Sequence, residues 1–553
     1  MAKGKTEARS TDQLNESEFG HLESEKYLYE QRYIPVQHFE DDENVPYRVI
    51  LSTYLMYFIL ILIGKMTDFF ASIFDKDYQQ WLLPHDGYAP LVTKFDSFYT
   101  RRLKDRLGDC FSRPTTGVPG RLIKVMMRRF AERRVFAQLE VTGEVRDCIN
   151  LSSYNYLGFA QSVGQCTDAA EEAIYERGLI AGGTRFNGGC SDMHEETEKI
   201  VAQFVGKEVA MLYSMGYATN ANFFASIADR HCLVLSDELN HASIRTGLRV
   251  AGAVVKVFKH NNMKNLEEMI REHIAQGQPK THRPWLKIFV VVEGLYSMEG
   301  TLCNLPELIK LREKYGIYLF VDEAHSIGAM GPHGRGVCDY FGVDTKNVDI
   351  LMGTFTKSFG ATGGYIAGSK ELIERLKVAN MANVYAEAPT PPVLAQIQAS
   401  LKTLMGEINP GEARERLQRL AFNTRYFRLG LLRMGFVVSG HIDSPVIPLM
   451  LYHPSKMLAA SRLLLKKNVA VVLVGYPATP LLSSRIRFCM SSALKKSDLD
   501  YCLQKVQEVG DEIWLRISQQ TGKDGKRLRK SFEEAQVGLV EAALDPETNL
   551  EFI

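Results

Sequence analysis

Short apolar runs separated by helical segments dominate the middle of the chain. The runs show little alternation of apolar and polar positions, which is typical of strands buried on both faces. Their alternation with helical segments predicts βα units around a mostly parallel sheet. The runs occupy residues 209–213, 232–236, 254–258, 288–293, 317–322, 348–353 and 363–368.

The pattern changes beyond about residue 400. A helical segment is followed there by apolar runs at 434–440, 444–451, 469–475 and 485–491. This order predicts a smaller α+β domain. We therefore expect an α/β protein with a large domain over 146–400 and a small C-terminal domain over 401–515.

One strongly hydrophobic segment lies near the N-terminus. Residues 49–64 carry no charge and are flanked by Arg48 and Lys65. Every face of a helix formed by this segment would be apolar, unlike a helix on the surface of a soluble protein. The sequence predicts a membrane anchor over 46–74. Its uncharged part is slightly shorter than the roughly 20 residues that span a bilayer, so a spanning helix and a helix in the membrane plane both remain open.

Three polar segments flank the anchor and the body. Residues 1–45 are polar and acidic, without the basic start of a cleaved signal peptide, and predict a loose tail. Residues 516–553 predict a second, poorly packed tail. Between anchor and body, residues 75–145 predict juxtamembrane basic helices that lead into the small domain. Their cations suit solvent or anionic lipid headgroups, and less well an acyl-CoA phosphate: Arg101, Arg102, Arg121, Lys124, Arg128, Arg129, Arg133 and Arg134.

Composition narrows the class of protein. The 553 residues are 45% hydrophobic and 24% charged, with net charge +1, which excludes a disordered, fibrous or polytopic membrane protein. The balanced charge gives no reason to expect a nucleic-acid partner. Nine scattered cysteines without a C-x-x-C pair argue against a zinc site and against a disulfide framework. We expect a reducing compartment and no metal.

One motif points to a function that the rest of the chain excludes. Asp322, Glu323, Ala324 and His325 spell DEAH, a nucleotide-binding motif of helicases. A helicase also needs a phosphate-binding loop of the form G-x-x-x-x-G-K-[ST], and the sequence contains none.

Asp322 and Lys357 together indicate a different function. Asp322 ends an apolar run, and Lys357 follows within the glycine-flanked segment GTFTKSFG at 353–360. A lysine amine can form a Schiff base, and a carboxylate can keep a pyridine nitrogen protonated. At neighbouring strand ends the two face one crevice. The pair predicts pyridoxal 5'-phosphate as the cofactor.

Two further segments fit this cofactor. Residues 214–217 follow an apolar run and open a helix, whose free N–H groups and dipole suit a phosphate. Gly216 lets the backbone approach closely. His241 has a flat ring that can stack on a pyridine, and His325 can hydrogen-bond its phenolic oxygen.

Longer motifs identify a family. The chain resembles the α-oxoamine synthases, which are fold-type-I pyridoxal-phosphate enzymes, and among them the catalytic subunits of eukaryotic serine palmitoyltransferases. The resemblance covers roughly residues 25–515. It rests on NLSSYNYLG (150–158), GGTRFNGGCSDMHEETE (182–198), SMGYATN (214–220), SDELNHASIRTG (236–247), VEGLYSMEG (292–300), VDEAHSIGAMGPHGRG (321–336), GTFTKSFG (353–360) and RIRFCMSSA (485–493).

The resemblance implies roles for single residues around the cofactor. Lys357 would carry the Schiff base, Asp322 would pair with the ring nitrogen, His241 would stack on the ring and His325 would bind the ring oxygen. Thr354 would contact the phosphate.

Further roles follow for the phosphate, the partner and the substrate. Gly216 and Tyr217 match the phosphate and ring-edge segment, while Tyr154 and Asn155 match positions that reach the partner protomer's active site. Arg487 matches the arginine that binds the amino-acid carboxylate. Arg485 shares its strand face, so either arginine remains a candidate.

The resemblance also implies a reaction and an assembly. L-Serine and palmitoyl-CoA would condense with loss of CO2 and CoA, giving 3-ketodihydrosphingosine. Expected partners are a homologous non-catalytic subunit 1, small activating and ORM-type regulatory subunits, and the endoplasmic reticulum membrane, with the catalytic domain cytosolic. The alternatives are a sister synthase using glycine or alanine, and a non-catalytic scaffold subunit, against which Lys357 argues.

Overall fold

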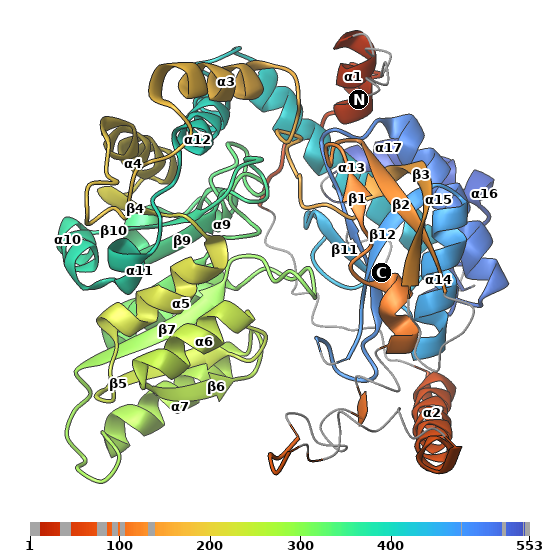
Figure 1. Ribbon diagram of the computed structural model, residues 1–553, viewed down its shortest axis with the longest axis horizontal. Coiled ribbons are helices and arrows are strands. Elements are labelled where there is room, and N and C mark those ends of the chain that lie inside the picture. Colours follow the sequence, from red (N-terminus) through yellow and green to blue (C-terminus); the bar gives the residue numbers. More distant parts are fainter. Residues whose placement is uncertain are drawn as a thin grey trace.

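The computed structural model describes residues 11–33, 46–74, 84, 86–90, 98–99, 105–130, 139–476, 478–521, 527–545 and 547. Its two sheets, each with its own helices, form the left and right parts of the molecule in Figure 1. The left part holds a seven-stranded sheet and the right part a six-stranded one.

The seven-stranded sheet confirms every apolar run predicted for the large domain. In the order β4-β10-β9-β8-β7-β5-β6, all neighbours are parallel except β10, which is antiparallel to β4 and β9. Its strands are β4 (Val209–Tyr213), β5 (Cys232–Asp237), β6 (Val254–Phe258), β7 (Lys287–Glu293), β8 (Tyr318–Asp322), β9 (Ile350–Thr354) and β10 (Gly364–Gly368).

Both faces of this sheet are buried, which explains why its strands lack polar alternation. Along β7, Phe289 and Val291 pack in one apolar cluster, while Val290 and Val292 pack in another. The helices of this part are α3 (Gln165–Arg177), α4 (Asp192–Val205), α5 (Gly216–Ile227), α6 (Ala242–Ala251), α7 (Met263–Gln276), α8 (Leu305–Tyr315), α9 (Val337–Phe341), α10 (Lys370–Ala379), α11 (Met381–Tyr385) and α12 (Pro391–Leu404).

The six-stranded sheet joins the two ends of the body. Its order is β1-β2-β3-β12-β13-β11, and only β3 and β12 pair in parallel. The predicted run at 434–440 contributes only an isolated bridge at Val438. The strands are β1 (Thr115–Thr116), β2 (Leu122–Phe130), β3 (Leu139–Leu151), β11 (Val446–Met450), β12 (Val469–Val474) and β13 (Arg485–Cys489), with helices α13 (Glu412–Arg433), α14 (Pro454–Lys466) and α15 (Lys496–Glu512).

The prediction of basic helices over 75–145 is wrong for 115–116, 122–130 and 139–145, which lie in strands β1, β2 and β3. Strand β2 pairs with β3 from Leu122 to Phe130, with a register shift between Met126 and Arg128, and Ile123 and Val125 face the core. A short 3-10 helix, η4 (Asp105–Cys110), precedes it. Four of the predicted basic residues lie outside the described residues: Arg101, Arg102, Arg133 and Arg134.

The prediction of a loose N-terminal tail is wrong for residues 15–33, here called the N-terminal strap. The strap includes the end of α1 (Thr11–Glu18) and η1 (Glu25–Tyr27). Buried Glu18 accepts hydrogen bonds from Ser162, at 2.7 Å from its N–H and 2.5 Å from its hydroxyl. Gln31 accepts from the Gly331 N–H, at 2.8 Å. Distant partners therefore bury polar groups that look solvent-exposed in the sequence.

The C-terminal tail prediction fails for residues 527–545. Two helices, α16 (Phe532–Gln536) and α17 (Leu539–Leu544), pack on α13. Leu539 and Ala543 are buried there, and Arg425 of α13 donates to the Ala543 carbonyl at 2.8 Å. Residues 522–526 lie outside the described residues.

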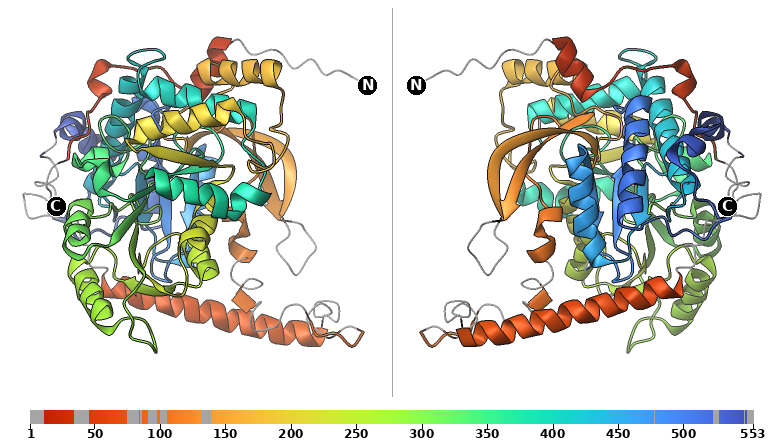
Figure 2. Two further views of the ribbon diagram at one scale, coloured as in Figure 1. Left: turned by 90° about the vertical axis from the view of Figure 1, so that its left-hand side faces the viewer. Right: turned by 90° about the vertical axis from the view of Figure 1, so that its right-hand side faces the viewer.

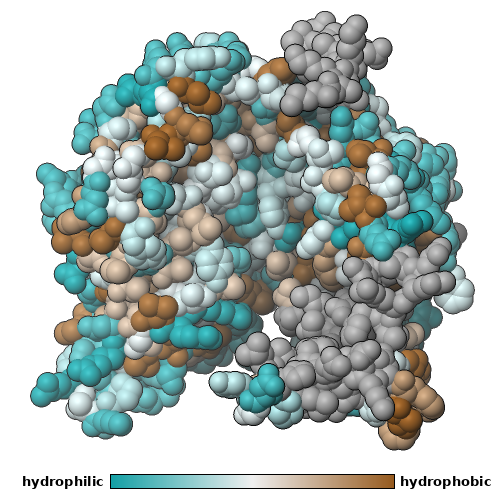
Figure 3. All heavy atoms as spheres, in the orientation of Figure 1, coloured by the Kyte–Doolittle hydropathy of each residue, from teal (hydrophilic) through white to brown (hydrophobic). Residues whose placement is uncertain are grey.

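The hydrophobic N-terminal segment forms one helix, α2 (Tyr47–Phe74), long and apolar enough to cross a membrane. It lies along the base of the body (Figure 2), where Val49 packs with Val437, Met450 and Tyr452. Its outward side exposes hydrophobic atoms at the lower right of Figure 3. The exposed large residues include Leu51, Leu55, Phe58, Leu62, Phe69, Ile73 and Phe74.

Candidate active site

The predicted cofactor residues converge at the carboxyl ends of the parallel strands. Asp322 ends β8, and Thr354 ends β9, three residues before Lys357. Loops after β4 and β5 bring Gly216 and His241 to the same edge. Adjacent parallel strands end at one edge of a sheet, so side chains that are far apart in sequence meet there.

Asp322 is a buried carboxylate held only by neutral donors. Its Oδ2 accepts from Asn220 Nδ2 at 2.7 Å, and its Oδ1 accepts from the Ala324 N–H at 2.9 Å. The carboxylate is only 3% exposed. Among the described residues, no cation forms an ion pair with it. A buried carboxylate without a cationic partner fits a protonated ring nitrogen.

The Lys357 amine has a lowered pKa. Burial lowers its pKa to about 8, against the opposing charges of Asp322 and Glu293. Its Nζ lies 5.8 Å from the centre of the Tyr154 ring. Within the described part of the chain, no hydrogen bond or ion pair engages this amine. A lysine with a lowered pKa is a good Schiff-base former.

The two histidines occupy different surroundings. His241 caps the N-terminus of α6, with Nδ1 2.7 Å from Ser243 Oγ, and burial lowers its pKa. His325 is buried, with Nδ1 2.8 Å from the Tyr156 hydroxyl. Burial and the Lys357 charge hold the pKa of His325 well below its usual value. Its Nε2 is therefore left for a hydrogen bond to a ligand.

The start of α5 forms a cradle for an anion. The helix begins at Gly216 without a side-chain cap, which leaves its first N–H groups available. A Cβ on Gly216 would lie 2.7 Å from Thr354 Oγ1, so only glycine fits beside that threonine. The Tyr217 hydroxyl is fixed 2.9 Å from Thr246 Oγ1. This cradle, together with Asp322 and Lys357, fits pyridoxal phosphate.

The two candidate arginines on β13 differ in their partners. Arg485 lies 3.6 Å from the Glu299 carboxylate and donates to the Met298 carbonyl at 2.8 Å. Arg487 has no ion-pair partner among the described residues, and its buried Nε has no hydrogen-bond partner there. Its guanidinium stands 4.8 Å from the centre of the Tyr154 ring. Arg487 donates one 3.4 Å hydrogen bond to the Ser297 carbonyl, whereas Arg485 already has the Glu299 carboxylate beside it. Arg487 is therefore the better candidate to bind a substrate carboxylate.

Tyr154 and Asn155, predicted to serve a partner protomer, separate in this chain. The Tyr154 ring lies beside Lys357, Arg487 and His325 of its own chain. The Asn155 side-chain NH2 donates to the Pro119 carbonyl at 3.1 Å, and its oxygen accepts from the Ala160 N–H at 3.2 Å. Asn155 therefore connects the turn before Ala160 to the segment at Pro119 of its own chain. A contact of either residue with a partner stays a prediction.

Sequence reasoning assigned no role to four residues that hold the site together. Asn220 and Ser243 connect Asp322 to His241, Tyr156 holds His325, and Glu293 accepts the His241 N–H. All four lie inside the motifs that carry the family resemblance. For Asn220, Ser243 and Glu293 the signal was a polar residue at a strand end or in the first turns of a helix, whereas Tyr156 lies in a turn after β3.

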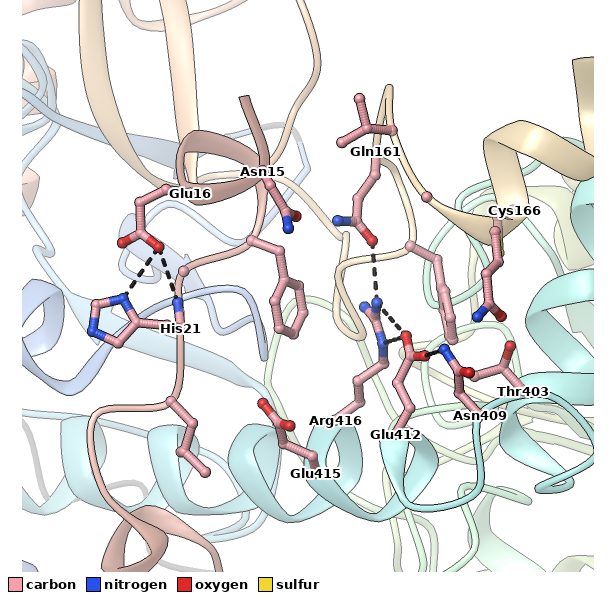
Figure 4. A pocket seen from close by; sticks show the side chains of 17 residues that line it. Asn15, Glu16, His21, Gln161, Cys166, Thr403, Asn409, Glu412, Glu415 and Arg416 are labelled. Carbon is pink, nitrogen blue, oxygen red and sulfur yellow. Dashed lines mark hydrogen bonds and ion pairs between the residues drawn. The ribbon is translucent and has the colours of Figure 1, made fainter. Parts of the chain in front are cut away.

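A cavity of about 790 Å³ lies elsewhere, between the N-terminal strap, the 159–166 loop and the start of α13 (Figure 4). None of the predicted site residues lines it. The Arg416 guanidinium sits 4.3 Å from the ring centres of both Phe19 and Phe159, held by Glu412 and Gln161. The cavity marks a junction between strap and body.

Comparisons with known proteins agree with this geometry. The family model for aminotransferase class I and II matches residues 146–506. Serine palmitoyltransferase 2 of Kluyveromyces lactis is 56% identical, covering 94% of this chain and 93% of that protein. The Saccharomyces cerevisiae protein of the same name is 55% identical, covering 95% and 93%.

Solved structures extend the agreement to the fold. A high-resolution structure of SPT with PLP internal aldimine is 28% identical, with a TM-score of 0.67, covering 77% of this chain and 99% of that one. Sphingomonas wittichii serine palmitoyltransferase is 27% identical, with a TM-score of 0.66, covering 77% and 99%. This chain belongs to the aminotransferase class I and II family and, within it, to the serine palmitoyltransferase 2 family.

Proposed function

We propose that this chain is the catalytic subunit of a serine palmitoyltransferase. It condenses L-serine with palmitoyl-CoA to give 3-ketodihydrosphingosine, CoA and CO2, the first step of sphingolipid biosynthesis. The observation that carries this proposal is the pairing of half-buried Lys357 with buried Asp322 at neighbouring strand ends, in a chain 55–56% identical to proteins named serine palmitoyltransferase 2. A scaffold subunit would not need the lysine.

The cofactor is pyridoxal phosphate, whose ring accepts electrons and so stabilises negative charge at the serine Cα. Lys357 would bind it covalently, Asp322 would pair with the ring nitrogen, His241 would stack on the ring and His325 would hydrogen-bond the ring oxygen. Gly216 and Tyr217 at the start of α5, together with Thr354 at the end of β9, would hold the phosphate.

Three side chains act on serine. Arg487, which has no ion-pair partner among the described residues, binds the serine carboxylate with paired hydrogen bonds. The Lys357 amine would take the Cα proton as general base, and its pKa of about 8 leaves it partly neutral near pH 7. Tyr154 packs against both Arg487 and Lys357 and keeps their spacing.

A homologous non-catalytic subunit is the proposed partner at the edge of this site. The 183–187 loop bonds α11, with the Phe186 N–H 3.1 Å from the Asn383 carbonyl. Three large apolar side chains of these two segments are exposed: Phe186, Met381 and Tyr385. Exposed apolar side chains of this kind suit an interface.

The membrane completes the proposal. Helix α2 attaches the body to the endoplasmic reticulum membrane, with the catalytic domain on the cytosolic side, where small activating and ORM-type regulatory subunits join it. A long-chain acyl-CoA and its product both partition into bilayers. An active site held at the membrane surface shortens both transfers.

The test is CoA-thiol release by the detergent-purified chain, alone and co-expressed with a non-catalytic subunit. Palmitoyl-CoA is offered with serine, glycine or alanine, and Lys357→Ala is the blank. Serine-selective release that depends on the partner is the expected result. Preference for glycine or alanine would make the chain a sister synthase, and no release in any combination would make it a scaffold.

A further inference from the structure

Two carboxyl groups stand side by side at the base of the active site, and the proposed reaction uses only one. Glu293 ends β7 and is in register with Asp322 at the end of β8. Paired residues of adjacent strands project to the same face of a sheet, so both carboxyl groups point toward the site. Both residues are buried, at 5% and 3% exposure. Glu293 needs an explanation of its own.

The surroundings of Glu293 do not favour a negative charge. Its Oε1 accepts a hydrogen bond from the His241 backbone N–H, at 2.5 Å. Among the described residues no cation forms an ion pair with it. Burial, together with the charge of Asp322, raises the pKa of Glu293 well above its usual value. Lys357 is the cation that feels its charge, while Glu299 and Asp237 add to the negative field.

A chain of hydrogen bonds leads from Asp322 to His241. Asn220 Nδ2 donates to Asp322 Oδ2 at 2.7 Å and to Ser243 Oγ at 3.0 Å. The Ser243 hydroxyl is then free to donate to His241 Nδ1, 2.7 Å away. This assigns the neutral tautomer of His241 with its proton on Nε2. The His241 ring is therefore held by hydrogen bonds that lead through Ser243 and Asn220 to Asp322.

The backbone of His241 is held from the Glu293 side. The Glu293 bond fixes the N–H of the residue at which α6 starts, just where the loop after β5 ends. The ring and backbone of His241 are thus anchored by two different strands, β8 and β7. Loss of either anchor frees the ring to turn away from the cofactor.

We propose that Glu293 is a positioning residue for His241, which it holds over the cofactor by accepting the backbone N–H, and that this role needs the acceptor oxygen and not a negative charge. The inference rests on the proposed binding of pyridoxal phosphate. It leaves Asp322 as the one charged carboxylate at the ring nitrogen. A second charge beside it would compete for the same proton.

The experiment compares Glu293→Gln with Glu293→Leu in the full chain co-expressed with its partner subunit. The apo form is titrated with pyridoxal phosphate, and the absorbance of the bound cofactor and kcat and KM for serine are recorded. Glutamine keeps the acceptor, so we expect cofactor affinity within about twofold of the parent chain. Leucine leaves a buried N–H unpaired, so we expect affinity to fall by about tenfold or more.

A second background shows whether Glu293 acts through His241. In His241→Ala there is no ring to position, so Glu293→Leu should add less than about twofold to the loss. Full additivity would overturn the proposal, as would a tenfold loss in Glu293→Gln. If Glu293→Leu does not fold, a tenfold loss of cofactor affinity in Glu293→Gln would still overturn the proposal. A parent chain that binds no pyridoxal phosphate would instead refute the proposed function.

Discussion

The active site and the N-terminal strap are both rich in polar side chains, yet they are built differently. Site residues follow buried strands, so the pattern of the chain itself marks where Asp322 and Thr354 lie. Strap residues such as Glu18 and Gln31 follow no such pattern, and their partners are Ser162 and Gly331. The sequence therefore indicates the polar residues of the active site, because they follow apolar strands. It does not indicate which polar residues of the strap are buried, because their partners are distant in the sequence.

The largest effect is expected from a substitution of Lys357 in the active site. Lys357→Ala removes the amine that binds the cofactor and takes the proton, so turnover should fall by about a thousandfold or more. CoA-thiol release measures it, with the thermal midpoint as a check on folding. An active variant would refute the role of this strand-end site.

The two arginines test whether a strand pattern alone identifies a ligand. Arg487→Lys loses paired hydrogen bonds to the serine carboxylate, so KM for serine should rise by about tenfold to a hundredfold. Arg485→Lys is the matched control on the same face of β13, already paired with Glu299. Its KM should change much less. Equal effects on KM would show that the two guanidinium groups share the substrate.

The site should also respond to pH in a way that the strap does not. Because burial lowers the Lys357 pKa to about 8, the neutral amine becomes dominant only above that pH. The rate at which the apo chain combines with pyridoxal phosphate should fall about tenfold for each pH unit below 8 and level off above it. Stopped-flow absorbance measures this rate.

The pKa shift of Lys357 also determines how the stability of the apo chain changes with pH. Its folded pKa is lowered from 10.5 to about 8, so between these values the unfolded chain binds more protons than the folded chain. The apo chain should therefore gain stability from Lys357 as pH rises from 8 to 10.5. A cofactor-combination rate that does not vary between pH 6 and 9 would contradict the lowered pKa.

The smallest effect on turnover is expected in the strap. Glu18→Ala removes both hydrogen bonds from Ser162 to the buried carboxylate, which should cost about 1–3 kcal/mol of stability while turnover changes little. Glu30→Ala is the control, because Glu30 is exposed and its ion pair among the described residues is a surface one with Arg32. Thermal midpoints compare the two. Equal midpoints would mean that the strap does not stabilise the body.

The sequence predicted the large-domain strands well, because burial on both faces leaves a continuous apolar signature. It misassigned 122–130, since the basic residues of β2 hid the alternation of Ile123 and Val125. It treated both ends of the chain as tails, because composition cannot show that Arg425 reaches the Ala543 carbonyl. It also missed Asn220 and Glu293, whose roles depend on neighbours in other strands.

The sequence by itself determined the chemistry of the site: a lysine and an aspartate at strand ends, a glycine before a helix, and an apolar helix ahead of the body. Those features are local, because strand ends and helix starts are set by nearby residues. Only the tertiary structure decided which arginine of β13 pairs with Glu299, that Tyr154 lies beside its own Lys357, and that Glu293 stands next to Asp322. Such pairings depend on strand order and register, which bring together residues that no local pattern connects.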